Sequence, residues 1–398
     1  MRLWLAPLSL LLACDGAPRQ APSPSAEGST KPAVADLAEP AARGPAAAKH
    51  AEPPPVAEPP PASEPPPVRS DGTIYASAEL MGTRVSLNVW LPPTVTAAAA
   101  GAAMQAALDA MADVEDSMSE WRSDSELSRL SQAAGGSTVA VSDGLFEVLS
   151  RAKSIATETN GAFDPTFHGV GQLWSFAPGA QPPSRAAVAE KLPLVDYRAL
   201  EIDARAKTVR LAKAGMMLGL GAIAKGYAVD RASALLTERG LAHHVVEAGG
   251  DTYAAGTKGG TPWVVGIQRP GDRGVVGVLP TTDRAVVTSG NYQRYFEHEG
   301  KRYAHILDPK TGWPIVADKS PKSVTVLAAN ATDADAFATA VAVLGATAGM
   351  AFVESHADLE AVVIDASDKV YISSGLEELA IPGGPLAHAR DPAVATPK

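Results

Sequence analysis

Hydrophobic and polar residues follow two kinds of pattern between residues 84 and 372. Short β-like runs predict strands, and longer segments, Ala-rich or preceded by a capping residue, predict helices. The expected helices cover residues 94–117, 142–159, 222–239 and 332–344, with Ser142 and Thr332 as expected N-caps. The expected strands cover residues 84–91, 244–247, 263–268, 275–279, 285–288, 302–306, 323–328, 361–364 and 370–372, with shorter runs near Leu200 and Val209.

The order of these elements indicates the fold class. Helices and strands are mixed without the regular alternation of a βαβ fold, and this favours antiparallel pairing. We therefore expect an α+β protein: a single large domain of mixed, largely antiparallel sheets with packed helices. The domain is expected to cover residues 71–384, and a flexible Pro- and Ala-rich tail is expected at residues 385–398.

The first 70 residues are expected to lie outside this domain. Residues 1–13 have the pattern of a secretory signal peptide, because Arg2 is followed by an apolar stretch too short to span a bilayer. Cys14 is the only cysteine and follows Ala13 as in a bacterial lipidation site, although a plain signal peptide with an incidental cysteine is the alternative. The Pro-, Ala- and Glu-rich residues 14–70 predict a semi-stiff linker. We therefore expect a lipoprotein of the cell envelope that faces the periplasm or the outer surface.

Charge and motif content exclude several classes of function. The net charge is −10 and has no basic block, so we expect no nucleic-acid partner. The chain contains no serine-hydrolase elbow, no Walker A loop and no His pattern of the zinc type.

Asp335 and Thr339 are four residues apart in an expected helix, so their side chains share one face. Two oxygen ligands on one face suit a hard cation such as Mg²⁺, which completes its shell with phosphate and water. The alternative is an acidic residue in the first turn of a helix and a buried Thr, and the spacing alone favours it.

Small residues at 219–226 lead into another expected helix and contain Lys225. Backbone amides at the start of a helix and a Lys side chain favour phosphate, although tight helix–sheet packing explains the glycines equally well. In the turn at 161–166, Phe163 and Asp164 could bind a ring and its polar edge, or the turn is only structural.

His305 stands at the end of an expected strand, directly before the turn formed by residues 308–312. It could be a general base or a phosphate contact, whereas a lone His is more often structural. The residues alone thus indicate an exported enzyme or binder for a phosphate-bearing ligand with magnesium.

Taken together and in order, these segments resemble the ApbE family of FAD:protein FMN transferases. The motifs that carry the resemblance are MGT at 81–83, GAFDPT at 161–166, GAIAKG at 221–226, GGD at 249–251, HILDPKTG at 305–312 and DAFATA at 335–340. The resemblance implies FAD as the substrate, Mg²⁺ as the cofactor and an acceptor flavoprotein whose Thr or Ser hydroxyl attacks FMN, with AMP released.

The resemblance also assigns residues to the site. The positions that match flavin-binding ones are Met81, Trp121, Ala162, Phe163, Asp164, Lys225 and Ile306. The backbone carbonyl of Ala222 and the side chains of Asp335 and Thr339 match the magnesium site. His305 matches a His near the diphosphate, so His305 and Lys225 are the expected catalytic residues.

Three positions depart from the family pattern. Gly219 stands where the family usually has an Asp that contacts the flavin nucleotide, Glu247 stands where Asn is frequent, and Ala338 stands where some members carry a second Asp. Two rival functions use the same site: a magnesium-dependent FAD pyrophosphatase, in which water attacks, and a non-catalytic FAD-binding lipoprotein.

Overall fold

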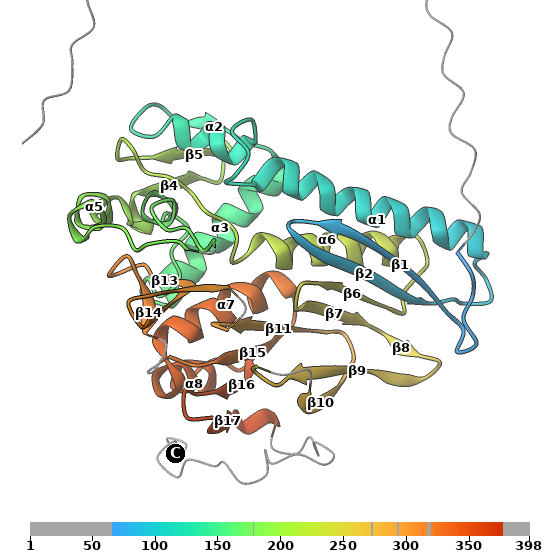
Figure 1. Ribbon diagram of the computed structural model, residues 1–398. Helices are drawn as coiled ribbons and strands as arrows, with labels where there is room; N and C mark the ends of the chain where they lie inside the picture. Colours follow the sequence, from blue (N-terminus) through green and yellow to red (C-terminus); the bar gives the residue numbers. More distant parts are fainter. Residues whose placement is uncertain (1–65, 178, 272–273, 293, 317–319, 377–398) are drawn as a thin grey trace, which may run out of the picture. The chain divides into compact units, whose positions relative to one another are not determined.

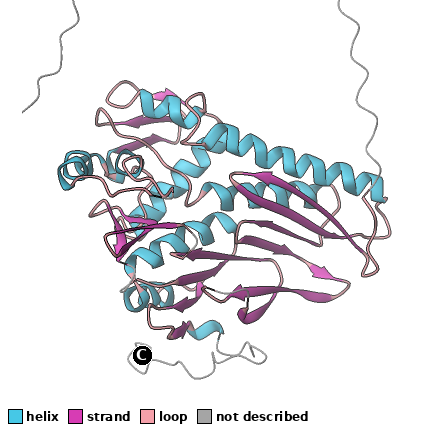
Figure 2. Cartoon of the chain, viewed as in Figure 1, coloured by secondary structure: helices cyan, strands magenta, loops and turns pink. Residues whose placement is uncertain are grey.

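An eight-stranded sheet is the centre of the fold in the computed structural model, which describes residues 66–376 except 178, 272–273, 293 and 317–319 (Figures 1 and 2). Its strand order is β1-β2-β6-β7-β11-β15-β16-β17, and all neighbouring strands pair antiparallel. The predicted α+β class with largely antiparallel sheets is therefore confirmed. The expectations for residues 1–65 and for the tail lie outside the described residues, and the domain limits stay a prediction.

The strands of the large sheet are β1 (Thr73–Leu80), β2 (Thr83–Trp90), β6 (His244–Ala248), β7 (Asp251–Ala255), β11 (Arg284–Gly290), β15 (Ser323–Ala328), β16 (Glu360–Ile364) and β17 (Val370–Ile372). Three smaller sheets contain β3 (Val139–Ala140), β4 (Leu200–Asp203) and β5 (Thr208–Leu211); β8 (Thr257–Lys258), β9 (Thr261–Gln268) and β10 (Val275–Thr281); and β12 (Tyr295–His298), β13 (Lys301–Asp308) and β14 (Trp313–Val316).

The α-helices are α1 (Ala97–Met118), α2 (Glu126–Gln132), α3 (Asp143–Glu158), α4 (His168–Gly171), α5 (Arg185–Lys191), α6 (Ala224–Glu238), α7 (Ala331–Leu344) and α8 (Ala346–Glu354). Helix α6 packs against α1, α7, β6 and β7, and α7 packs against β11 and β15. Side chains such as Leu87, Met111 and Val326 are fully buried in the main core formed by these elements. The sheet and the two central helices thus hold the starts of α6 and α7 close together.

The structure corrects several predicted boundaries. Strand β1 was not predicted; it forms a hairpin with β2 through Met81 and Gly82, whose φ angles of 53° and 68° match the primed turns that hairpins favour. Strand β7 and helices α2, α4 and α5 were also not predicted. Helix α6 starts at Ala224 rather than at residue 222, because residues 221–223 form a turn.

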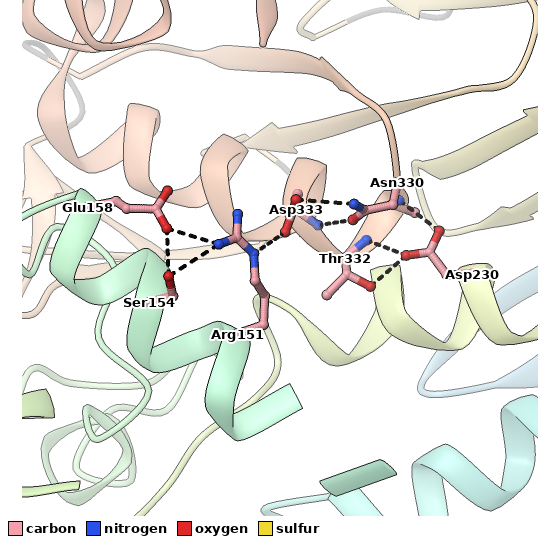
Figure 3. A network of polar contacts seen from close by, with 8 residues as sticks. Arg151, Ser154, Glu158, Asp230, Asn330, Thr332 and Asp333 are labelled. Atoms are coloured by element: carbon pink, nitrogen blue, oxygen red, sulfur yellow. Dashed lines mark hydrogen bonds and ion pairs between the residues drawn. The ribbon is translucent and has the colours of Figure 1, made fainter. Parts of the chain in front are cut away.

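The predicted N-cap Thr332 is wrong, because Asn330 caps α7 by accepting the amide of Asp333 at 2.7 Å. Figure 3 shows what Thr332 does instead: its amide and hydroxyl donate to Asp230 of α6, at 2.8 and 2.5 Å. The amide of Ala331 donates to the other oxygen of Asp230 at 2.8 Å. A carboxylate of one helix thus binds the free amides at the start of the other, which fixes the two helices relative to each other.

Candidate active site

An ion cluster lies where α6, α7 and β7 meet. The Lys225 ammonium is 2.9 Å from Asp251 Oδ2 and lies 3.3 and 3.2 Å from the two carboxylate oxygens of Asp335. Both carboxylate side chains are almost completely buried, at 3% and 4% exposure, whereas that of Lys225 is 25% exposed. One partly accessible cation therefore balances two buried anions.

The environment of this cluster shifts its titrations. Burial lowers the pKa of Lys225, but the charges of Asp251 and Asp335 raise it more, so the net shift is upward and the ammonium stays charged. Burial, followed by the negative charge of Asp335, raises the pKa of Asp251 well above its usual value of 3.8. The carboxyl of Asp251 therefore takes up a proton at a higher pH than an ordinary aspartate does.

Helices α6 and α7 cross close to each other near their N-terminal ends. Asp230 contacts the start of α7, Gly226 four residues earlier donates its amide to Asp335 at 3.3 Å, and Lys225 binds the same carboxylate. Residues 225, 226 and 230 of α6 thus contact residues 331–335 of α7, and the joint metal site of Ala222, Asp335 and Thr339 stays a prediction. A Cβ on Gly226 would lie 2.1 Å from the carbonyl oxygen of Ala331, so this close crossing requires glycine.

The donors at this point suit a hard cation. Asp335 supplies a carboxylate that already forms an ion pair with the Lys225 ammonium. Thr339 Oγ1 lies 3.5 Å from the hydroxyl oxygen of Ser289 on β11, so a second hydroxyl stands beside the predicted ligand. Within the described residues there is no group of three or more His, Cys, Asp or Glu side chains that could hold a metal. Oxygen donors with a single charged ligand fit Mg²⁺ shared with phosphate better than zinc or copper.

His305 lies on β13 with its ring fixed by the backbone. Its Nδ1 donates to the carbonyl oxygen of Arg294 at 3.1 Å, which leaves Nε2 as an acceptor. Burial lowers the pKa of His305; the hydrogen bond to Arg294 opposes this shift, and the positive charges of Arg294 and Lys225 reinforce it. A neutral imidazole is thus present near the Lys225 cluster, and the adjacent Ile306 is buried in the main core.

The predicted flavin-binding residues divide into buried and exposed ones. Ala162 and Phe163 are only 2% and 4% exposed, and Asp164 holds its own loop by accepting bonds from Thr166 and from the amide of Tyr197. This turn therefore has a structural role in the fold, and ring binding by it stays a prediction.

Trp121 is 76% exposed, the largest exposure among the large hydrophobic side chains described. The amide of Met81 donates to Glu115 at 2.7 Å, which ties the β1–β2 turn to α1. Flavin contact by these residues stays a prediction.

Comparison with known proteins decides the family. The ApbE family model matches residues 81–363 of the chain. This chain belongs to the ApbE family. The predicted resemblance is thereby confirmed, and the motifs that carried it all lie within the matched residues.

Relatives of similar length extend this result. The FAD:protein FMN transferase of Treponema pallidum is 36% identical over 320 residues, which are 76% of this chain and 87% of that protein. The FAD:protein FMN transferase of Vibrio cholerae is 32% identical and covers 76% of this chain and 92% of its own. The ApbE protein of Thermotoga maritima matches with a TM-score of 0.70 at 30% identity, covering 76% of this chain and 98% of that structure.

Two acidic residues of this ApbE protein near Lys225 were not predicted as site residues. Asp251 is the last residue of the GGD motif, to which no site role was assigned, and it binds Lys225 from β7. Burial raises the pKa of Glu120, while the amides of Leu220 and Gly221 and the charge of Lys225 act in the opposite direction. The carboxylate of Glu120 therefore faces the loop that leads to Ala222, beside Trp121.

A separate cavity of the described residues lies away from this cluster. It has a volume of about 1310 Å³ and is lined by side chains of α3, α6 and the start of α7, such as Arg151, Tyr227 and Thr332, but not by Lys225, Asp251 or Asp335. No described helix is long and apolar enough to cross a membrane.

Proposed function

We propose that this chain is a magnesium-dependent FAD:protein FMN transferase that links FMN to a Thr or Ser hydroxyl of an acceptor flavoprotein and releases AMP. The enzyme class rests on membership of the ApbE family and on relatives that carry this name. The observation that carries the finer statement is the Lys225–Asp251–Asp335 cluster, because it combines a fixed cation with a buried oxygen ligand at one helix crossing.

The residues of the cluster have separate tasks in this reaction. Asp335, Thr339 and the carbonyl of Ala222 would hold Mg²⁺, which neutralises negative charge on the diphosphate when it is bound. Lys225 adds a second positive charge whose position is fixed by two carboxylates. Fixed charges of this kind stabilise the transition state of phosphoryl transfer because they need no reorganisation.

The acceptor hydroxyl attacks the phosphorus of the FMN half, and the bond from this phosphorus to the AMP oxygen breaks. Neutral His305, with Nε2 as an acceptor, is suited to take the hydroxyl proton or to contact the diphosphate. The products are a phosphoester-linked flavin on the acceptor and AMP.

Incubation of the protein with FAD, Mg²⁺ and a candidate acceptor, followed by intact mass measurement, tests this function. We expect the acceptor to gain the mass of FMN less one water and AMP to appear in equal amount. Free FMN with an unchanged acceptor would indicate the pyrophosphatase instead, and bound FAD without AMP would indicate a non-catalytic binder. Omission of Mg²⁺ or addition of a chelator should stop both products.

We further propose that the mature protein begins at a lipidated Cys14 and is held at the cell envelope, with residues 14–70 as the tether. The support is the apolar stretch that ends at Ala13 and the Pro-rich composition that follows. Cys14→Ser should release the protein from the membrane fraction while flavin transfer in solution is retained. A variant that stays membrane-bound with the same mass as the wild type would contradict the anchor.

A further inference from the structure

His168 is a polar residue that lies almost wholly inside the fold. It begins α4, two residues after the last residue of the GAFDPT motif, and is only 4% exposed. Its imidazole makes ring contacts with Trp121 and Phe167, at centroid distances of 5.4 and 6.3 Å, but no hydrogen bond to any residue in the described part of the chain. The His168 ring nitrogens are not among the fully buried side-chain atoms of the described residues that lack a partner, so they are open to solvent or to a ligand.

The surroundings of His168 suit a flat ligand. Trp121 meets the His168 ring edge-on, with an interplanar angle of 89°, and is itself 76% exposed. An exposed indole beside a buried imidazole offers a flat apolar surface and a polar edge at one point. This combination suits a planar heteroaromatic ring that carries both hydrogen-bond donors and acceptors.

Gly219 lies against His168 and Phe167, and a side chain has no room there. A Cβ on Gly219 would lie 2.7 Å from Cε1 of Phe167 and 3.1 Å from Cβ of His168. The amide of Gly219 also donates to the carbonyl oxygen of Pro165 at 2.8 Å, which fixes the two loops against each other. The Phe167–His168 pair therefore fills the space at the start of the 219–221 loop, and His168 brings a polar ring to it.

We infer that His168 is a specificity-determining residue that hydrogen-bonds the polar edge of the flavin ring of FAD, beside Trp121. This inference rests on the proposed function, because it takes FAD as the substrate. A neutral imidazole can present either its N–H donor or its acceptor nitrogen, and the flavin pyrimidine edge offers a C=O or an N–H group as the partner of either. Burial lowers the pKa of His168 and so favours this neutral form.

The test compares the two halves of the substrate. Affinities of FAD, FMN and AMP are measured by calorimetry for the wild type and for His168→Phe, which keeps an aromatic ring on Trp121 but removes both nitrogen atoms. We expect roughly five- to tenfold weaker binding of FAD and of FMN, the effect of one lost hydrogen bond, and unchanged binding of AMP. The KM for FAD should rise while kcat stays close to the wild-type value.

His356→Phe is the matched control, because His356 also packs on aromatic rings, those of Phe352 and Phe337, but lies at the end of α8. His168→Leu serves the same comparison if the Phe variant does not fold. Unchanged FMN affinity, or a loss confined to AMP, would overturn the assignment. A wild-type protein that binds neither FAD nor FMN would instead overturn the proposed function.

Discussion

Replacing Asp335 with Ala should abolish flavin transfer at ordinary magnesium concentrations. Asp335 is the only charged residue among the three proposed magnesium ligands, and its buried carboxylate also binds the Lys225 ammonium and the Gly226 amide. Without it, Lys225 remains paired with Asp251 alone, and Mg²⁺ loses its only charged protein ligand. The bound diphosphate then faces less positive charge. Thr339→Ala removes only a neutral donor and should impair transfer less, so that a higher magnesium concentration recovers part of the activity.

Asp333→Ala provides the matched control for this prediction. Asp333 lies two residues away on α7, and its carboxylate binds Arg151 of α3 rather than the Lys225 cluster. Its loss should lower the melting temperature while transfer and its magnesium dependence stay unchanged. Initial rates at several Mg²⁺ concentrations, with and without chelator, are compared for all three variants. Full activity of Asp335→Ala, or a wild type that ignores the chelator, would rule out the proposed role.

The parts of the fold that sequence predicted are those with a strong local signal. Ser142 was predicted to cap α3, and its hydroxyl indeed accepts the amide of Leu145. Strand β1 was missed because the polar and small residues between Ile74 and Leu80 form a strand only through pairing with β2. The start of α7 was misplaced because Asn330 and Thr332 are both capping residue types, and only the contact of Thr332 with Asp230 on α6 distinguishes them.

The site residues likewise divide into those with a local sequence signal and those defined by contacts between distant segments. Lys225 and Asp335 could be selected because each belongs to a motif that resembles a known family, and the structure places them in contact across 110 residues of sequence. Asp251 also belongs to such a motif but was given no role, and His168 lies outside all of them; the contacts of both come from segments distant in sequence. The resemblance could identify Gly219 as a departure, but only the packing of Phe167 and His168 explains why a side chain has no room there.

Replacing Lys225 with Met should cost more stability than any other single change in this site. The substitution leaves the carboxylates of Asp251 and Asp335 buried, at 3% and 4% exposure, without their counter-ion. Breaking a buried ion pair from one side typically costs about 3–5 kcal/mol in unfolding free energy. Transfer should also be lost, because the fixed positive charge beside the diphosphate is absent.

The pH dependence of this loss follows from the sign of the shift at Asp251. Its pKa in the folded protein already lies well above 3.8, so ionised Asp251 opposes folding and its protonated form favours it. Removing the Lys225 charge, which lowers this pKa, raises it further. The destabilisation of Lys225→Met should therefore be largest at neutral and alkaline pH and should shrink as the pH falls and Asp251 takes up a proton.

The double variant Lys225→Met/Asp251→Asn separates stability from chemistry. The amide of Asn removes one of the two buried charges at almost constant shape, so urea unfolding at pH 8 should show that much of the lost stability returns. Flavin transfer should not return, because the ammonium is still absent. Recovery of both stability and transfer would mean that Lys225 only neutralises buried carboxylates. No recovery of stability would mean that the charge of Asp251 is not the source of the loss.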